Sequence, residues 1–204
     1  MVRRTKEEAL ETRNRLLDVA ETLFQARGVS RTSLADIAEA AGVTRGAVYW
    51  HFENKADLFG AMIERVVLPI EETVHRIDAH EDPIAQIRTS IRDALRRAAR
   101  DPQARRVFEI VSHKVEYVDE MSAARDRHLE SRSGCLSHVE RGLKLAIKQG
   151  QLAHGVNARS AAIGLHALMD GLIQNWMLAP DAFDLEREGA RATDTYLTGL
   201  GAAL

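Results

Sequence analysis

The 204-residue sequence predicts an all-α fold of about nine helices, in which a small three-helix unit precedes a larger helical region. Apolar residues recur at helical spacing along most of the chain, and no segment shows the period of two that marks a strand. Asp–Pro pairs and single glycines lie where helices are expected to begin or end. These observations together favour a protein built only of helices and loops.

The first predicted helix covers residues 9–27. Leu17, Ala20 and Phe24 recur at helical spacing along it, and the pattern stops before Gly28. Glycine commonly ends a helix because it has no steric penalty at positive φ.

Two short helices joined by a turn are predicted next. Ser33 is a good N-cap for the first, and Asp36 lies three residues on, where a capping box has its acid. Gly42 suits the turn because a positive φ is needed there, and Thr44 then caps the second helix. This is the layout of a helix-turn-helix, whose second helix enters the major groove of DNA.

The second short helix has residues suited to reading DNA. Arg45 and Tyr49 are i, i+4 on one face, Val48 lies on the other, and Gly46 lets the backbone approach base edges closely. Ordinary packing of a small domain is the alternative, chiefly for Trp50. The predicted DNA-binding residues are Ser33, Thr44, Arg45, Gly46, Tyr49, Trp50, His51 and Lys55.

The charge of the chain does not by itself indicate nucleic-acid binding. The net charge is −2, and residues 1–60 carry nine Lys or Arg against nine Asp or Glu. Positive charge is placed locally instead, around Arg45 and in an N-terminal arm that holds Arg3, Arg4 and Lys6. Such an arm either reaches DNA phosphates and the minor groove or is simply a solvated terminus.

Several of these segments resemble a known family, the TetR family of transcriptional regulators. The matching motifs are TSLADIAEAAGV, TRGAVYWHF and NKADLF, and the preceding stretch resembles the family's first helix. HKVEYVDEM and DGLIQNW extend the likeness to the AcrR/TtgR-like repressors of multidrug efflux pumps. The resemblance implies a repressor released from operator DNA by hydrophobic or aromatic molecules. A metabolite, such as a fatty acyl compound, is the alternative cue.

A long helix, 55–80, is expected to connect two domains, a DNA-binding domain at 1–54 and a ligand-binding and dimerisation domain at 55–204. Pro69 lies inside this helix and should kink it, or else begin a separate helix. The only plausible seam is near residues 53–57. Further helices are predicted at about 83–99, 102–120, 123–149, 158–178 and 184–202.

Helix 158–178 is apolar on more than one face, which indicates burial on two sides. The resemblance implies a homodimer formed through the last two helices, and a monomer with a thick core is the alternative. Asp170 stands out in this helix because a carboxylate among apolar residues needs a partner. Asp170 is either a polar anchor in a ligand pocket or a structural or interfacial pair, and His166, four residues before it, is a candidate partner.

The predicted pocket is lined by apolar residues from several helices, any of which is also a plausible core residue. Where relatives carry a cysteine in the HKxE motif, this chain has Val115, so no thiol sensor is expected there. The predicted ligand-binding residues are Val66, Ile87, Ile91, Phe108, Val111, Ser112, Cys135, Val139, His166, Met169, Asp170 and Ile173.

Composition favours a soluble protein of the cytoplasm. Hydrophobic residues make up 45% and charged residues 28% of the chain, and Cys135 is the single cysteine. Neither a signal peptide nor a membrane span is predicted. A helical metal enzyme is a poor alternative because two E-x-x-H pairs and an H-E-x-x-H motif are both missing, which leaves His113 and Glu116 as a weak pair. We therefore expect no cofactor, no metal and no enzymatic activity.

Overall fold

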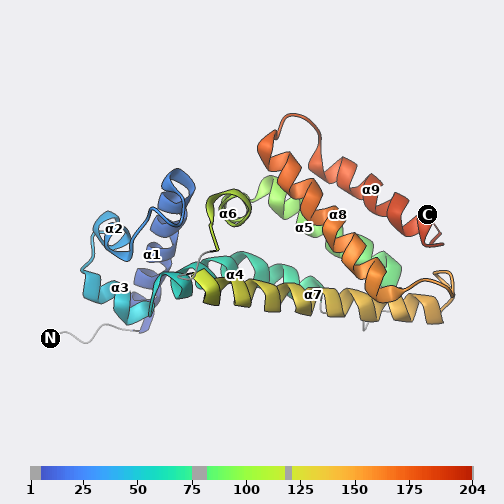
Figure 1. Cartoon of the computed structure of the whole chain (residues 1–204), viewed down its shortest axis with the longest axis horizontal. Coiled ribbons are helices and arrows are strands. Elements are labelled where there is room, and N and C mark those ends of the chain that lie inside the picture. Colours follow the sequence, from blue (N-terminus) through green and yellow to red (C-terminus); the bar gives the residue numbers. More distant parts are fainter. Residues whose placement is uncertain (1–5, 75–81, 118–120, 204) are drawn as a thin grey trace. The chain divides into compact units, whose positions relative to one another are not determined.

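The computed structural model describes residues 6–74, 82–117 and 121–203, and of residues 67–74 only the backbone. The described residues form nine α-helices and one π-helical turn (Figure 1). They divide into two compact units. The first joins the chain up to Arg65 with residues Arg106–His128, and the second joins Val66–Arg105 with Leu129–Leu204. The seam that the sequence suggests, near residues 53–57, lies within the first unit.

The first unit contains α1 (Lys6–Arg27), α2 (Leu34–Ala40), α3 (Arg45–His51) and the beginning of α4 (Lys55–Val74). Its core is formed by side chains that these helices turn toward one another. The largest fully buried ones are Leu16, Leu17, Phe24, Ile37, Phe52, Leu58, Phe59 and Met62. Burial of these apolar groups is the main force that holds the short helices α2 and α3, which are too short to persist alone.

The local signals around α2 and α3 confirm the predicted turn. Ser33 and Asp36 form a complete capping box at the start of α2. Gly42 has φ of 65°. The N–H of Gly42 donates to Glu39 O over 3.0 Å, and the N–H of Val43 donates to Ala38 O over 3.0 Å. These two bonds define a Schellman motif, which satisfies the last carbonyls of α2 and redirects the chain into α3.

Helix α4 runs without interruption from Lys55 through Pro69 to Val74. Pro69 therefore does not begin a separate helix. The expected continuation to residue 80, with Ile77, lies outside the described residues.

The predicted single helix over 102–120 is wrong. α6 (Pro102–Glu109) changes into the π-helical turn η2 (Ile110–Lys114), and Val115 is extended, with φ −110° and ψ 135°. The carbonyl of Lys114 accepts a hydrogen bond from the N–H of Val29 over 2.9 Å. This tertiary bond, from a residue far away in the sequence, takes the carbonyl that a continuing helix would use.

The second unit is built from α5 (Pro83–Arg100), α8 (Ala158–Leu178), α9 (Leu185–Gly199) and most of α7 (Ser122–Lys148). Helices α5, α8 and α9 pack against one another, as Figure 1 shows. Asp82 caps α5 and Pro83 is its first residue, as the sequence predicts. No helix in the described part of the chain is long and apolar enough to span a membrane. The core of the unit includes Ile84, Ile87, Leu136, Leu143, Ala162, Leu165 and Leu197.

Candidate nucleic-acid interface

Helix α3 presents its predicted reading face to solvent. Tyr49 is 60% exposed and Trp50 72% exposed, whereas Val48, the residue before Tyr49, is fully buried. Arg45 is also exposed. Val48 therefore anchors the helix to the core, and the opposite face is left free for a partner. The exposure of Trp50 does not fit the alternative in which this residue packs in the core.

The first turn of α3 is built for a close approach. The Thr44 hydroxyl accepts a hydrogen bond from the N–H of Ala47 over 3.2 Å, which caps the helix. A Cβ added at Gly46 would meet only the Thr44 hydroxyl, at 3.9 Å. The glycine is thus not required by packing inside the protein. An open backbone at the start of a helix is the geometry that phosphates and base edges use.

Two neighbouring polar residues are partly engaged. The Ser33 hydroxyl donates to Asp36 Oδ2 over 2.7 Å and accepts from the N–H of Asp36 over 3.2 Å. His51 is half-buried, and its ring stands edge-on to Trp50 with 4.6 Å between ring centroids. Ser33 is therefore first a helix cap, and His51 supports the exposed indole.

Lys55 is placed differently from the sequence prediction. Its side chain is only 7% exposed, and its ammonium donates to the Val29 carbonyl over 3.2 Å. The aliphatic stem lies in the core and the charge is tied to the loop after α1. In this conformation the ammonium is not presented to a DNA partner. This bond holds the start of α4 against the loop that follows α1.

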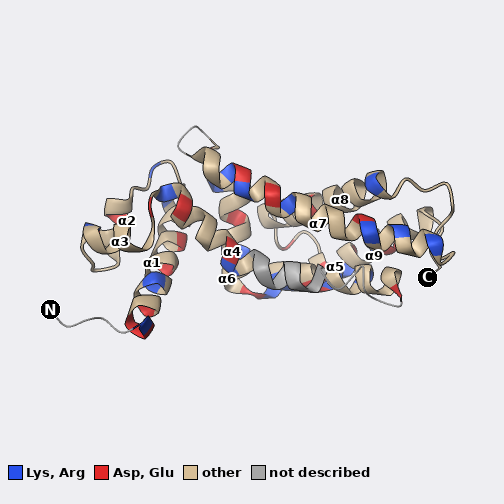
Figure 2. Ribbon diagram, turned by 90° about the horizontal axis from the view of Figure 1, so that it is seen from below, with Lys and Arg blue, Asp and Glu red and all other residues tan. Residues whose placement is uncertain are grey.

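The N-terminal arm is described only in part. Arg3 and Arg4 lie outside the described residues, and Lys6 is an exposed residue at the start of α1. Figure 2 shows that both signs of charge alternate along α1. Arg45 is an exposed positive group on α3 itself.

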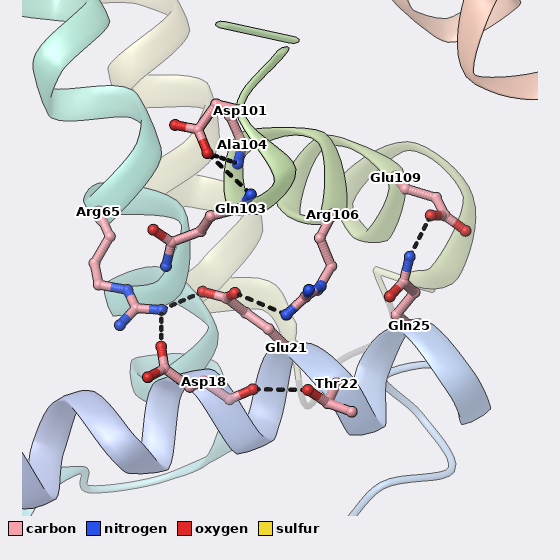
Figure 3. A network of polar contacts seen from close by, with 10 residues as sticks. All are labelled: Asp18, Glu21, Thr22, Gln25, Arg65, Asp101, Gln103, Ala104, Arg106 and Glu109. Carbon is pink, nitrogen blue, oxygen red and sulfur yellow. Dashed lines mark hydrogen bonds and ion pairs between the residues drawn. The ribbon is translucent and has the colours of Figure 1, made fainter. Parts of the chain in front are cut away.

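A buried charged network lies behind this surface and was missed by the sequence reasoning (Figure 3). Glu21 of α1 is 1% exposed and contacts two guanidinium groups. It accepts a short hydrogen bond from Arg65 of α4, and its other oxygen lies 3.8 Å from Arg106 Nη1 of α6. Gln25 Nε2 of α1 donates to Glu109 Oε2 of α6 over 2.7 Å, which forms a second link between these two helices.

The network favours the charged form of Arg65. Burial opposes the charged form of Arg65, but hydrogen bonds to Asp18 and Glu21 outweigh burial and raise the pKa of Arg65. A buried carboxylate with two partners is costly to disturb, because removing one member leaves the others unpaired. A clue was present in the sequence: Glu21 follows Leu17 by four residues and so falls on the apolar face of α1.

The predicted ligand-binding residues are divided between the two units. Ile87, Ile91, Cys135 and Val139 belong to one apolar cluster of the second unit. Phe108, Val111 and Ser112 belong to the first unit, where they are half-buried. The remaining apolar residues lie in the second unit: Val66 and Ile173 are buried and Met169 is half-buried.

Asp170 is not enclosed by the apolar residues of its own chain. Its side chain is 55% exposed and lies 3.3 Å from Nδ1 of His166, the partner suggested by the sequence. Leu165 and Ile173 on α8 face the core, whereas Asp170 lies on the outward face. The helix has more than one apolar face, and Ile163 and Leu178 on its outward face remain exposed among the residues that the structure describes.

The capped turn, the buried anchor and the outward Arg45 and Tyr49 define a helix-turn-helix regulator followed by an all-helical second unit. Comparison with known sequences agrees. Residues 16–62 match the family described as bacterial regulatory proteins, tetR family, and residues 82–201 match the MAATS-type transcriptional repressor, C-terminal region. The chain belongs to the TetR family of transcriptional regulators.

Its relatives include repressors of multidrug efflux pumps. The transcriptional regulator TtgR of Pseudomonas putida is 40% identical over 199 residues, covering 97% of this chain and 95% of TtgR. The crystal structure of NalD, the secondary repressor of the MexAB-OprM multidrug efflux pump of Pseudomonas aeruginosa, superposes with a TM-score of 0.88 at 35% identity, covering 96% and 98%. A complex of SmeT with triclosan superposes with a TM-score of 0.84 at 33% identity, covering 93% and 91%. SmeT represses the Stenotrophomonas maltophilia pump SmeDEF.

Proposed function

We propose that this protein represses a multidrug efflux operon and leaves its operator when a hydrophobic or aromatic compound binds. The observation that carries the proposal is the outward face of α3, with Arg45 and exposed Tyr49, in a chain related to efflux-pump repressors along nearly its whole length. We also propose a cytoplasmic, non-enzymatic role without a cofactor, which the same relationship supports.

The operator would be read by two copies of α3. A twofold dimer presents its recognition helices to successive major grooves, so the expected site is a pseudo-palindrome. In this proposal Arg45 would contact a base edge or phosphate and the Tyr49 hydroxyl a phosphate, and the exposure of both residues supports this. Specific contacts of this kind are each worth about 1–3 kcal/mol.

The dimer would form through α8 and α9. Ile163, Ala167, Asp170, Gln174 and Leu178 follow one another at helical spacing on α8, and all are exposed in the single chain. Exposed large apolar residues such as Ile163 and Leu178 are a reason to expect a covering partner. The predicted burial of α8 on two sides is then completed by a second copy.

The effector would enter the second unit. Apolar residues from α5, α7 and α8 supply its core, which suits ligands recognised mainly by apolar contact. The complex of SmeT with triclosan supports an aromatic effector, since SmeT is a repressor of similar sequence and fold. Ile87, Ile91, Cys135 and Val139 remain our proposed lining residues.

Release would follow from a shift between two conformations. α4 and α7 pass from the first unit to the second, and α6 passes from the second to the first. Glu21 ties α4 and α6 to α1 through Arg65 and Arg106. An effector that binds one arrangement of these helices better lowers operator affinity by its differential affinity, typically about 1–3 kcal/mol.

Fluorescence anisotropy with the full-length protein and labelled duplexes from its own promoter region tests the proposal. We expect saturable binding to one pseudo-palindromic duplex and release by triclosan, but no release by a fatty acyl thioester. Release by the acyl thioester alone would assign the protein to a metabolic operon. Failure to bind any duplex from that region would overturn the proposal.

A further inference from the structure

A cationic cleft lies in the first unit, apart from the reading face of α3. It has a volume of about 280 Å³ and is lined by the end of α1, by the loop that follows it, and by the segment at the end of η2. This is just below the range of roughly 300–1,000 Å³ that is usual for pockets of drug-sized ligands. Its polar and mostly cationic lining favours a charged ligand over an apolar drug.

The charge of the lining is strongly biased. Arg27, Arg31 and Lys114 carry permanent positive charge, His113 lies beside them, and Glu116 is the only carboxylate in the lining. Arg27 and Arg31 are exposed and form no ion pair or hydrogen bond with any residue that the structure describes. Their guanidinium groups are thus available to a ligand, and planar guanidinium groups suit phosphate and carboxylate oxygens.

Two acids outside the lining offset part of this charge. Lys114 Nζ lies 3.9 Å from Glu109, which also accepts a hydrogen bond from Gln25. Asp36 lies near enough to Arg27 for a coulombic interaction, and its carboxylate also accepts hydrogen bonds from Ser33. Within the lining itself, three permanent cations face one carboxylate, that of Glu116.

The two walls of the cleft are fixed to each other. The Val29 N–H donates to Lys114 O over 2.9 Å, and Gln25 donates to Glu109 over 2.7 Å. An anion would therefore meet cations that are already gathered, and would lose less affinity to ordering them. We propose that this cleft is a binding site for a small oxyanion with two or more negative charges, such as a phosphate compound or a polycarboxylate.

Isothermal titration calorimetry on the full chain tests this, with inorganic pyrophosphate and citrate as separate probes at constant ionic strength. We expect one saturable site per chain for at least one probe. The double variant Arg27→Gln/Arg31→Gln should weaken that binding at least tenfold. The control Arg132→Gln/Lys148→Gln also removes two exposed positive charges, but from α7, and should stay within twofold.

A second readout guards against loss of folding in the double variant. In the unaltered protein, pyrophosphate or citrate should shift the imidazole proton resonances of His113, which His113→Asn identifies. The site would be refuted by the absence of saturable heat for both probes, by equal loss in the control, or by an unmoved His113 resonance. Weaker, less salt-dependent operator binding by the double variant, without probe binding, would assign the arginines to DNA phosphates and also overturn the proposal.

Discussion

We expect operator recognition to depend most on Tyr49. Its ring is 60% exposed on a helix whose opposite face is locked by Val48, so truncation removes contact surface and no core packing. We expect Tyr49→Ala to weaken operator binding at least tenfold, the lower end of what a direct contact contributes. Anisotropy titration measures this change.

Two controls make the Tyr49 result specific. Sedimentation should show an unchanged oligomeric state, and Leu129→Ala, which trims an exposed apolar residue on α7, should leave operator affinity unaltered. If Tyr49→Ala binds the operator as strongly as the unaltered protein, then the exposed face of α3 is not the surface that recognises DNA.

The contacts of Lys55 and Glu21 could not be predicted from the sequence. The outward placement of Arg45 and Tyr49 follows from local periodicity, which the sequence contains in full. The ammonium of Lys55 instead finds the Val29 carbonyl, 26 residues earlier. Glu21 finds Arg65 and Arg106, on helices that only the tertiary fold brings close. Partners this distant cannot be read from spacing.

Glu21→Gln should destabilise the fold. The amide keeps the shape but loses the charge that satisfies two guanidinium groups, and breaking a buried pair costs about 3–5 kcal/mol. Arg65 and Arg106 are partly exposed, so hydration of their guanidinium groups offsets part of this cost. We expect the free energy of unfolding to fall by about 2 kcal/mol. Urea denaturation measures it as a lower midpoint at constant slope.

The matched control is Glu11→Gln, which removes an exposed carboxylate from the same helix. Its effect should stay within about 0.5 kcal/mol. Equal stability of the two variants would show that the carboxylate of Glu21 contributes nothing beyond its shape.

At the level of elements, local chemistry decides where helices begin, and tertiary contacts decide some of their ends. The caps at Ser33, Thr44 and Asp82 follow from residue type alone. The end of η2 at Lys114 does not, because the bond from Val29 that diverts the chain comes from another element. The predicted ligand-binding residues also belong to two units, and their spacing in the sequence does not indicate that division.

The capping box of α2 predicts a dependence on pH. Hydrogen bonds from the Ser33 side chain and backbone lower the pKa of Asp36 in the folded protein. A carboxyl with a lowered folded pKa stabilises the fold above its unfolded pKa, about 3.9, and this contribution disappears as the pH falls through the folded pKa.

Asp36→Ala should therefore lower the Tm at pH 7, and by a steadily smaller amount as the pH drops below 4. Differential scanning calorimetry at several pH values gives both curves. Asp126→Ala, on the exposed face of α7, serves as the control. A difference in Tm that is independent of pH would show that the charge on Asp36 has no part in the cap.

For the whole molecule, the outward face of α8 predicts an obligate pairing. Ile163→Arg places a charge where a second copy is expected, and a buried unpaired charge is costly. Sedimentation at micromolar concentration should show a monomer, with operator affinity lost because a single α3 reads only half a site. Ala85→Arg, an exposed position on α5, should remain dimeric. A dimer that persists in Ile163→Arg would move the interface to another face.

Coupling between effector binding and operator binding can be measured from both sides. If triclosan weakens operator binding by some factor, the operator must weaken triclosan binding by the same factor, because both describe one thermodynamic cycle. We expect a factor between about 5 and 150, which corresponds to about 1–3 kcal/mol. Calorimetric titration of triclosan into the free protein and into the protein–operator complex measures one side of the cycle, and anisotropy measures the other. Agreement between the two factors would show that triclosan and the operator bind to the protein as thermodynamically coupled ligands. Equal triclosan affinity for both forms would mean that the loss of DNA binding has another cause.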